Sequence, residues 1–104
     1  MNKQLNYWVR PAVTHTTDVQ TIIDNVCLHY GITEELLKKK SRFRTFVDAR
    51  NIVMYICRMN LKISLQDIAN IFGMNHSTVI HGINKVENLK DFDSDFKELI
   101  NRFV

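Results

Sequence analysis

The sequence predicts an all-α domain of five to six helices around one core. Its 104 residues suit a single domain, and 45% apolar with 24% charged residues is typical of globular proteins. With three glycines and one proline, it has little material for the many tight turns of an all-β fold. Several segments instead repeat apolar residues at helical spacing.

An extended N-terminal arm is expected over residues 1–16. The Arg10-Pro11 pair favours extended backbone there, and the aromatic Tyr7 and Trp8 are expected to lie on the domain. Residues 17–104 then form the predicted helical domain.

The first two helices are predicted from their capping residues. Thr17 and Gln20 have the spacing of a capping box, which predicts a helix reaching Tyr30 and closed by Gly31. Thr33 then predicts the start of a short helix with the sequence EELLKKK.

The middle of the chain contains the strongest apolar periodicity. It runs from about Thr45 to Met59 and predicts the central helix of the core. Ser64 and Asp67 predict the start of another helix, which Gly73 ends.

The last two helices follow a run of four polar residues, Asn75, His76, Ser77 and Thr78. The first of these helices is expected to reach about Leu89, and the second to span roughly Ser94 to Phe103. A helix, a glycine-bearing turn and a second helix together predict a helix-turn-helix, whose second helix enters the DNA major groove.

One face of that second helix is expected to approach DNA. On a wheel of 100° per residue, the face opposite the apolar stripe contains Ser77, His81, Asn84 and Asn88. Thr78 and Lys85 flank this face, and Gly82 is expected to add little bulk beside it. Short polar side chains suit base edges, since Asn pairs with adenine and Ser or Thr can donate or accept.

The charges are unevenly distributed along a chain of net charge +3. Basic residues gather before and along the central helix, while acids collect near the C-terminus. The basic residues are Lys38, Lys39, Lys40, Arg42, Arg44, Arg50, Arg58 and Lys62. This distribution favours a partner with a phosphate backbone, and an Arg on a loop can enter a narrow A·T-rich minor groove.

Other kinds of site are not indicated by the sequence. His76 and His81 are five residues apart, which is unfavourable for shared metal binding on a helix, and Cys27 and Cys57 are expected to be buried thiols. Neither a catalytic set nor a P-loop can be assembled, so we expect no enzyme activity, cofactor or metal. Neither a signal peptide nor a membrane span is indicated, so we expect a cytoplasmic location without a membrane partner.

A family resemblance rests on the segments RFRTFVDARNIVMYICR and ISLQDIANIFGMNHSTVIHGINKV. Together with the closing acidic helix, they resemble the C-terminal DNA-binding domain of the bacterial replication initiator DnaA. The most specific part is His-Ser-Thr-Val-Ile-His after Phe-Gly, and the similarity covers roughly residues 17–104. It implies a DnaA C-terminal, Trp-repressor-like helical fold that binds a short asymmetric duplex site as a monomer.

The resemblance also implies roles for individual residues. The residues matching Asn75, His76, Ser77 and Thr78 work in the major groove, and Arg42 or Arg44 matches the arginine of the minor groove. In the same way, Arg50 matches an arginine that reads a base, Arg58 matches a cation that holds phosphate, and Lys85 keeps a basic position of the second helix.

Departures from the family pattern leave specificity and biological role open. Asn75 stands where the family has an acid, and Asn can both donate and accept whereas Asp accepts from cytosine. The turn after Gly73 is one residue shorter, and the initiator's nucleotide-binding domain has no counterpart here. We therefore expect a free-standing reader of double-stranded DNA that binds no nucleotide and regulates replication initiation or transcription. The alternative is a module with this fold that docks on a replication protein without binding DNA.

Overall fold

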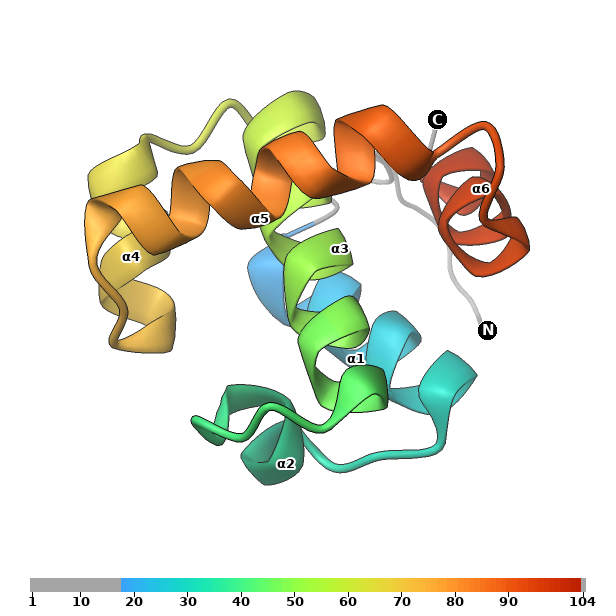
Figure 1. Ribbon diagram of the computed structural model, residues 1–104, viewed down its shortest axis with the longest axis horizontal. Coiled ribbons are helices and arrows are strands. Elements are labelled where there is room, and N and C mark those ends of the chain that lie inside the picture. Colours follow the sequence, from blue (N-terminus) through green and yellow to red (C-terminus); the bar gives the residue numbers. More distant parts are fainter. Residues whose placement is uncertain (1–17, 104) are drawn as a thin grey trace, which may run out of the picture.

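A computed structural model describes residues 18–103 of the chain, and these residues contain six α-helices and no strand. The predicted all-α fold is therefore confirmed (Figure 1). The expected arm lies outside the described residues. The helices are α1 (Val19–Tyr30), α2 (Glu34–Lys38), α3 (Arg44–Asn60), α4 (Leu65–Phe72), α5 (His76–Leu89) and α6 (Ser94–Arg102).

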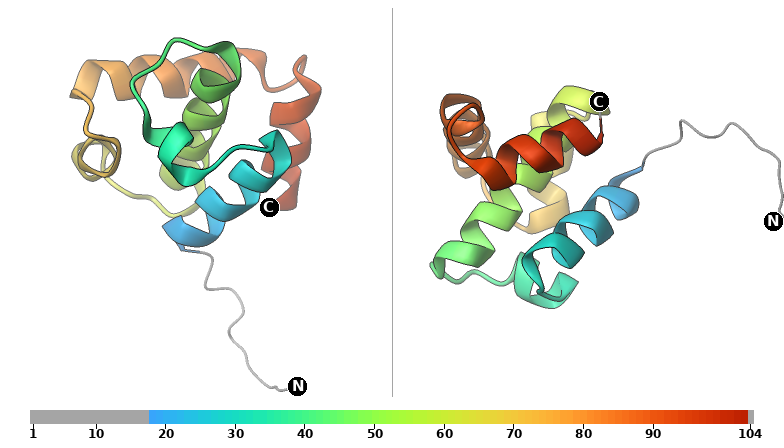
Figure 2. Two further views of the ribbon diagram at one scale, coloured as in Figure 1. Left: turned by 90° about the horizontal axis from the view of Figure 1, so that it is seen from below. Right: turned by 90° about the vertical axis from the view of Figure 1, so that its right-hand side faces the viewer.

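The core is built around α3, which contacts each of the other five helices. Most of its apolar side chains, among them Ile52, Val53 and Ile56, are almost completely buried. Figure 1 shows α5 lying across α3, with α4 at one end of α5 and α6 at the other, while α1 and α2 pack near the opposite end of α3. A second view shows the same arrangement from below (Figure 2). Burial of these apolar side chains against the surrounding helices stabilises the fold.

The first helix begins differently from the sequence prediction. Its N-cap is Asp18, whose carboxylate accepts the backbone N–H of Thr21 at 2.8 Å. Gln20 does not close a capping box; its side-chain amide donates to Asp24 and Glu34 instead. Thr17, the predicted cap, lies outside the described residues. The capping-box prediction is wrong because Asp18 fits the N-cap backbone geometry and offers a stronger acceptor.

The other predicted caps are confirmed. Thr33 accepts from the N–H of Leu36, and Ser64 accepts from the N–H of Asp67. Gly73 ends α4 with a left-handed φ of 62°, which a residue with a Cβ adopts only with strain. The backbone can therefore change direction immediately after α4, and α5 begins only a few residues later, at His76.

Gly82 lies at the contact between α5 and α3 rather than beside the polar face of α5. A Cβ added there would meet the side chains of Asn51 and Met54 on α3. The wheel prediction for this glycine was wrong because residue 82 belongs to the buried face, between Val79 and Val86. The missing side chain thus lets the two helix backbones approach closely and does not open the outer surface.

Both cysteines are buried and free, as predicted. Burial raises the pKa of the Cys57 thiol to about 11. Among residues 18–103, no three His, Cys, Asp or Glu side chains gather in a way that could hold a metal ion. None of the helices in this range is long and apolar enough to cross a bilayer.

Candidate nucleic-acid interface

The first turn of α5 presents its polar residues to solvent. Asn75, His76, Ser77 and Thr78 are all exposed, whereas Val79 directly after them is fully buried. Asn75 is the N-cap, and its Oδ1 accepts the backbone N–H of Thr78 at 2.8 Å. The same oxygen accepts the hydroxyl of Ser77 at 2.9 Å. One of the four polar residues therefore caps the helix, and the others remain accessible at its positive end.

A groove of about 310 Å³ separates this turn from the basic loop that precedes α3. Its walls come from two segments that are distant in the sequence but lie on the same side of the molecule (Figure 2). The lining residues are Lys40, Ser41, Arg42, Arg50, Gly73, Met74, Asn75 and Thr78. Four of the residues predicted from the sequence, Arg42, Arg50, Asn75 and Thr78, therefore meet in one place.

Arg50 stands in the floor of this groove with only 7% of its surface exposed. Its Nη1 donates to the carbonyl oxygens of Lys39 at 2.6 Å and Leu37 at 3.4 Å, and its Nη2 donates to that of Ser41 at 3.4 Å. Burial lowers the pKa of this guanidinium from its usual value. Arg50 thus ties the end of α2 and the basic loop to α3, through one carbonyl of α2 and two of the loop.

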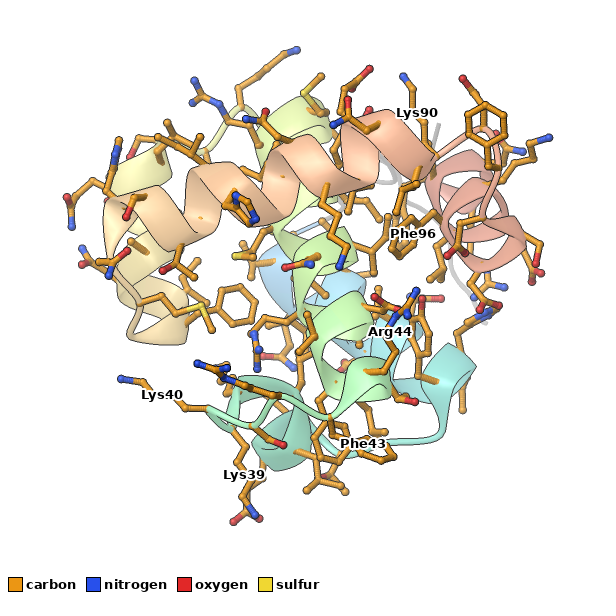
Figure 3. The ribbon with its side chains drawn as sticks, in the orientation of Figure 1. Lys39, Lys40, Phe43, Arg44, Lys90 and Phe96 are labelled. Atoms are coloured by element: carbon orange, nitrogen blue, oxygen red, sulfur yellow. The ribbon has the colours of Figure 1, made fainter. Side chains whose placement is uncertain are left out.

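Arg42, in the loop, and Arg44, the first residue of α3, occupy different surroundings. Arg42 is exposed and lines the groove. The Nε of Arg44 lies 3.1 Å from Oδ2 of Asp48 one helical turn later, and the Arg44 side chain is 74% exposed. In Figure 3, Arg44 extends on the α6 side of α3, whereas Lys40 extends on the α4 side. Among the two candidates, Arg42 is therefore the one beside the first turn of α5.

The remaining predicted residues lie away from this groove. Arg58 is exposed near the end of α3, and its Nη1 donates to the carbonyl of Ile63 at 3.1 Å. It lines a second hollow with Met59 and Ile80, formed by α3, α4 and α5. On α5 beyond the first turn, His81 is exposed and Lys85 is half-buried.

Lys40, Ser41 and Met74 also line the groove, although the sequence pattern predicted no individual role for any of them. Lys40 and Ser41 lie in the basic segment from which the sequence predicts a DNA-binding loop. Their position in the groove follows once the fold places that loop beside the first turn of α5. Met74 carries no polar signal and is found only from the fold.

The comparisons with known proteins agree with this geometry. A family model described as the bacterial dnaA protein helix-turn-helix matches residues 19–86. The chromosomal replication initiator protein DnaA 1 of Chlamydia pneumoniae is 39% identical over 66 residues, which are 64% of this chain and 14% of that protein. The DnaA of Geobacter sp. (strain M21) is 38% identical over 85 residues, 81% of this chain and 18% of that protein.

A longer match is found with the DnaA of Lachnoclostridium phytofermentans, which is 34% identical over 97 residues. It covers 92% of this chain but 21% of that initiator, so the chain spans about a fifth of the length of its relative. The matched family model covers α1 to most of α5, including both walls of the groove. The chain therefore belongs to the bacterial DnaA helix-turn-helix family.

Proposed function

We propose that this protein binds double-stranded DNA sequence-specifically, at a site like a DnaA box, and thereby regulates replication initiation or transcription. The observation that carries the proposal is the groove between the basic loop and the first turn of α5. In this arrangement α5 enters the major groove with Asn75, His76, Ser77 and Thr78 at the base edges. The loop then reaches the neighbouring minor groove.

Arg42 is the residue that we propose for the minor groove. It is exposed, and it lines the groove together with Lys40. Its guanidinium can therefore enter a narrow A·T-rich minor groove, where the negative potential is strongest. Arg44 is paired with Asp48, which offsets its charge.

Arg50 has a double role in this proposal. Three of its five N–H groups donate to the carbonyls of Leu37, Lys39 and Ser41, so the Nε–H and one Nη2–H remain for a base edge. It therefore positions the loop and contacts DNA from the floor of the groove. Arg58 and Lys85 supply phosphate contacts, and His81 continues the polar face of α5 beyond its first turn.

The test is to expose the purified protein to a random duplex library at near-physiological salt and sequence the retained duplexes. The wild type is expected to enrich one A·T-containing box, and His76→Ala is expected to relax preference at one or two base pairs, at a cost of about 1–3 kcal/mol. Arg42→Ala is expected to lose the A·T preference. Arg44→Ala is the matched control, since it removes the same charge two residues later, at the first residue of α3. Equal effects of the two arginine changes would contradict the minor-groove assignment, and no enrichment by the wild type would contradict the proposal.

A second candidate function is protein binding with the same fold, as a module that docks on a replication protein without contacting DNA. It is favoured by Phe92, which is 85% exposed on the turn between α5 and α6 and is flanked by Asp91 and Asp93. This candidate predicts no salt-dependent DNA affinity and a stable protein complex that Phe92→Ser weakens. If Phe92→Ser leaves the selected DNA sequences unchanged, DNA binding does not depend on the surface around Phe92.

A further inference from the structure

The side-chain carbonyl of Asn75 has no acceptor capacity left. Its Oδ1 accepts both the Thr78 N–H at 2.8 Å and the Ser77 hydroxyl at 2.9 Å, and a carbonyl oxygen has two lone pairs. The cap also settles the orientation of the amide, because only the oxygen can accept the N–H of Thr78. The exposed end of Asn75 is therefore its Nδ2 group, which can only donate.

The same hydrogen bond determines what Ser77 offers. The bond joins two oxygens, and Oδ1 of Asn75 carries no hydrogen, so the proton must come from Ser77. A hydroxyl has one proton and two lone pairs. With its proton directed to Asn75, Ser77 presents only lone pairs to its surroundings.

We infer that this cap sets the hydrogen-bonding polarity of the reading turn: Asn75 acts as a donor and Ser77 as an acceptor toward DNA. The inference rests on the proposed function and specifies which base edges it selects. The base that faces Asn75 must carry an acceptor, which excludes cytosine, since the major-groove edge of cytosine offers only an amino donor. The base that faces Ser77 must carry the amino group of adenine or cytosine.

Asn75→Asp tests this polarity directly. The substitution is nearly isosteric and keeps an equally good N-cap, so the fold is expected to stay intact, with unchanged circular dichroism and melting. It replaces the free donor by an acceptor. Asn101→Asp is the matched control, because it adds the same charge at an exposed position on α6, outside the helix-turn-helix.

Library selection with the three proteins gives the result. Asn75→Asp is expected to turn one position of the selected site from cytosine-excluding to cytosine-preferring, by about fivefold or more relative to the wild type. Asn101→Asp is expected to keep the wild-type base preferences. Ser77→Ala provides an independent measurement, and we expect it to lower the preference for an amino-bearing base at a nearby position by about the same factor.

Three results would overturn the inference. The first is an Asn75→Asp profile identical to the wild type, and the second is a wild type that already prefers cytosine at the position that Asn75→Asp changes. Either leaves DNA binding itself intact. The third is a wild type that enriches no duplex. This result would overturn the proposed function as well, whereas the first two would not.

Discussion

The number of basic residues in the sequence does not tell which of them are exposed in the folded protein. The sequence contains eight cations between residues 38 and 62, and nothing in their spacing tells which of them are exposed. Arg42 projects beside the turn before α5, Arg44 pairs with Asp48, and Arg50 is buried beneath the loop. The Arg44–Asp48 pair is local to α3, but the positions of Arg42 and Arg50 depend on how α2, α3 and the loop pack together, so these two could not be predicted from the sequence.

Arg50→Met should destabilise the protein. The change keeps the length of the side chain but removes the donors from the carbonyls of Leu37, Lys39 and Ser41. We expect the free energy of unfolding to fall by about 1–3 kcal/mol, as for buried groups that lose their partner. Urea denaturation measures this change.

Arg58→Met is the control for that experiment. Arg58 also donates to a backbone carbonyl, that of Ile63, but the site is exposed and water can replace the bond. We expect a loss below about 1 kcal/mol. Equal losses for the two substitutions would show that Arg50 does not hold the loop.

Helices were predicted far better than their interactions. The expected central helix, Thr45 to Met59, differs from α3 by one residue at each end, and the caps Thr33, Ser64 and Gly73 were correct. These signals are local, because a cap depends on a few neighbouring residues. The role of Gly82 was mispredicted because it depends on Asn51 and Met54 of another helix.

Gly73→Ala is expected to test the turn between α4 and α5. Its φ of 62° lies in the left-handed region, and an added Cβ would meet no atom within 4 Å, so the cost is one of backbone conformation alone. We expect the free energy of unfolding to fall by about 1–2 kcal/mol. DNA affinity should fall as well, because Gly73 lines the groove and sets the direction in which α5 begins.

Gly31→Ala is the matched substitution, since Gly31 ends α1 with a similar φ of 68° and also has open space around it. Its effect on chemical denaturation should match that of Gly73→Ala, while its affinity for the selected duplex should stay near the wild-type value. A similar loss of affinity in both variants would mean that the turn acts only through stability.

At the scale of the whole molecule, the candidate DNA-binding groove is formed by segments that are distant in the sequence. Arg42 and Asn75 are separated by α3 and α4 in the sequence, and only the packing of the helices brings them to one groove. The resemblance to the family named these residues, but the sequence contained no physical signal that they lie together. Affinity and stability should therefore respond differently to solution conditions, since exposed cations mediate the first and the packed core the second.

Stability should fall in acid. The pKa values of Asp18, Glu34 and Glu87 are lowered in the folded protein, chiefly by hydrogen bonds from Thr21, Gln20 and Lys90 respectively. As the pH falls below about 5, the unfolded chain therefore binds more protons than the folded protein. The three hydrogen-bonded carboxylates stabilise the fold fully above their pKa values in the unfolded chain, and this stabilisation is lost as the pH falls through their lower pKa values in the folded protein.

Urea denaturation at several pH values measures this effect. Asp18→Asn keeps a good cap but cannot titrate, so its stability should depend less on pH than that of the wild type. A wild-type stability that stays constant from neutral pH to well below the usual carboxyl pKa values of 3.8 and 4.5 would contradict the role of these hydrogen bonds.

DNA affinity should fall steeply with salt, because each phosphate contact releases condensed counterions and contributes about −0.9 to the slope of log K against log salt. Arg58→Ala should weaken binding to all duplexes alike and reduce that slope by about 1 if Arg58 holds a phosphate. Arg102→Ala is the control, since Arg102 lies on α6 and pairs with Glu98 at 2.9 Å. Titrations by fluorescence anisotropy at several salt concentrations give both slopes. If Arg102→Ala changes the slope as much as Arg58→Ala, the proteins respond to net charge alone, and Arg58 does not contact DNA.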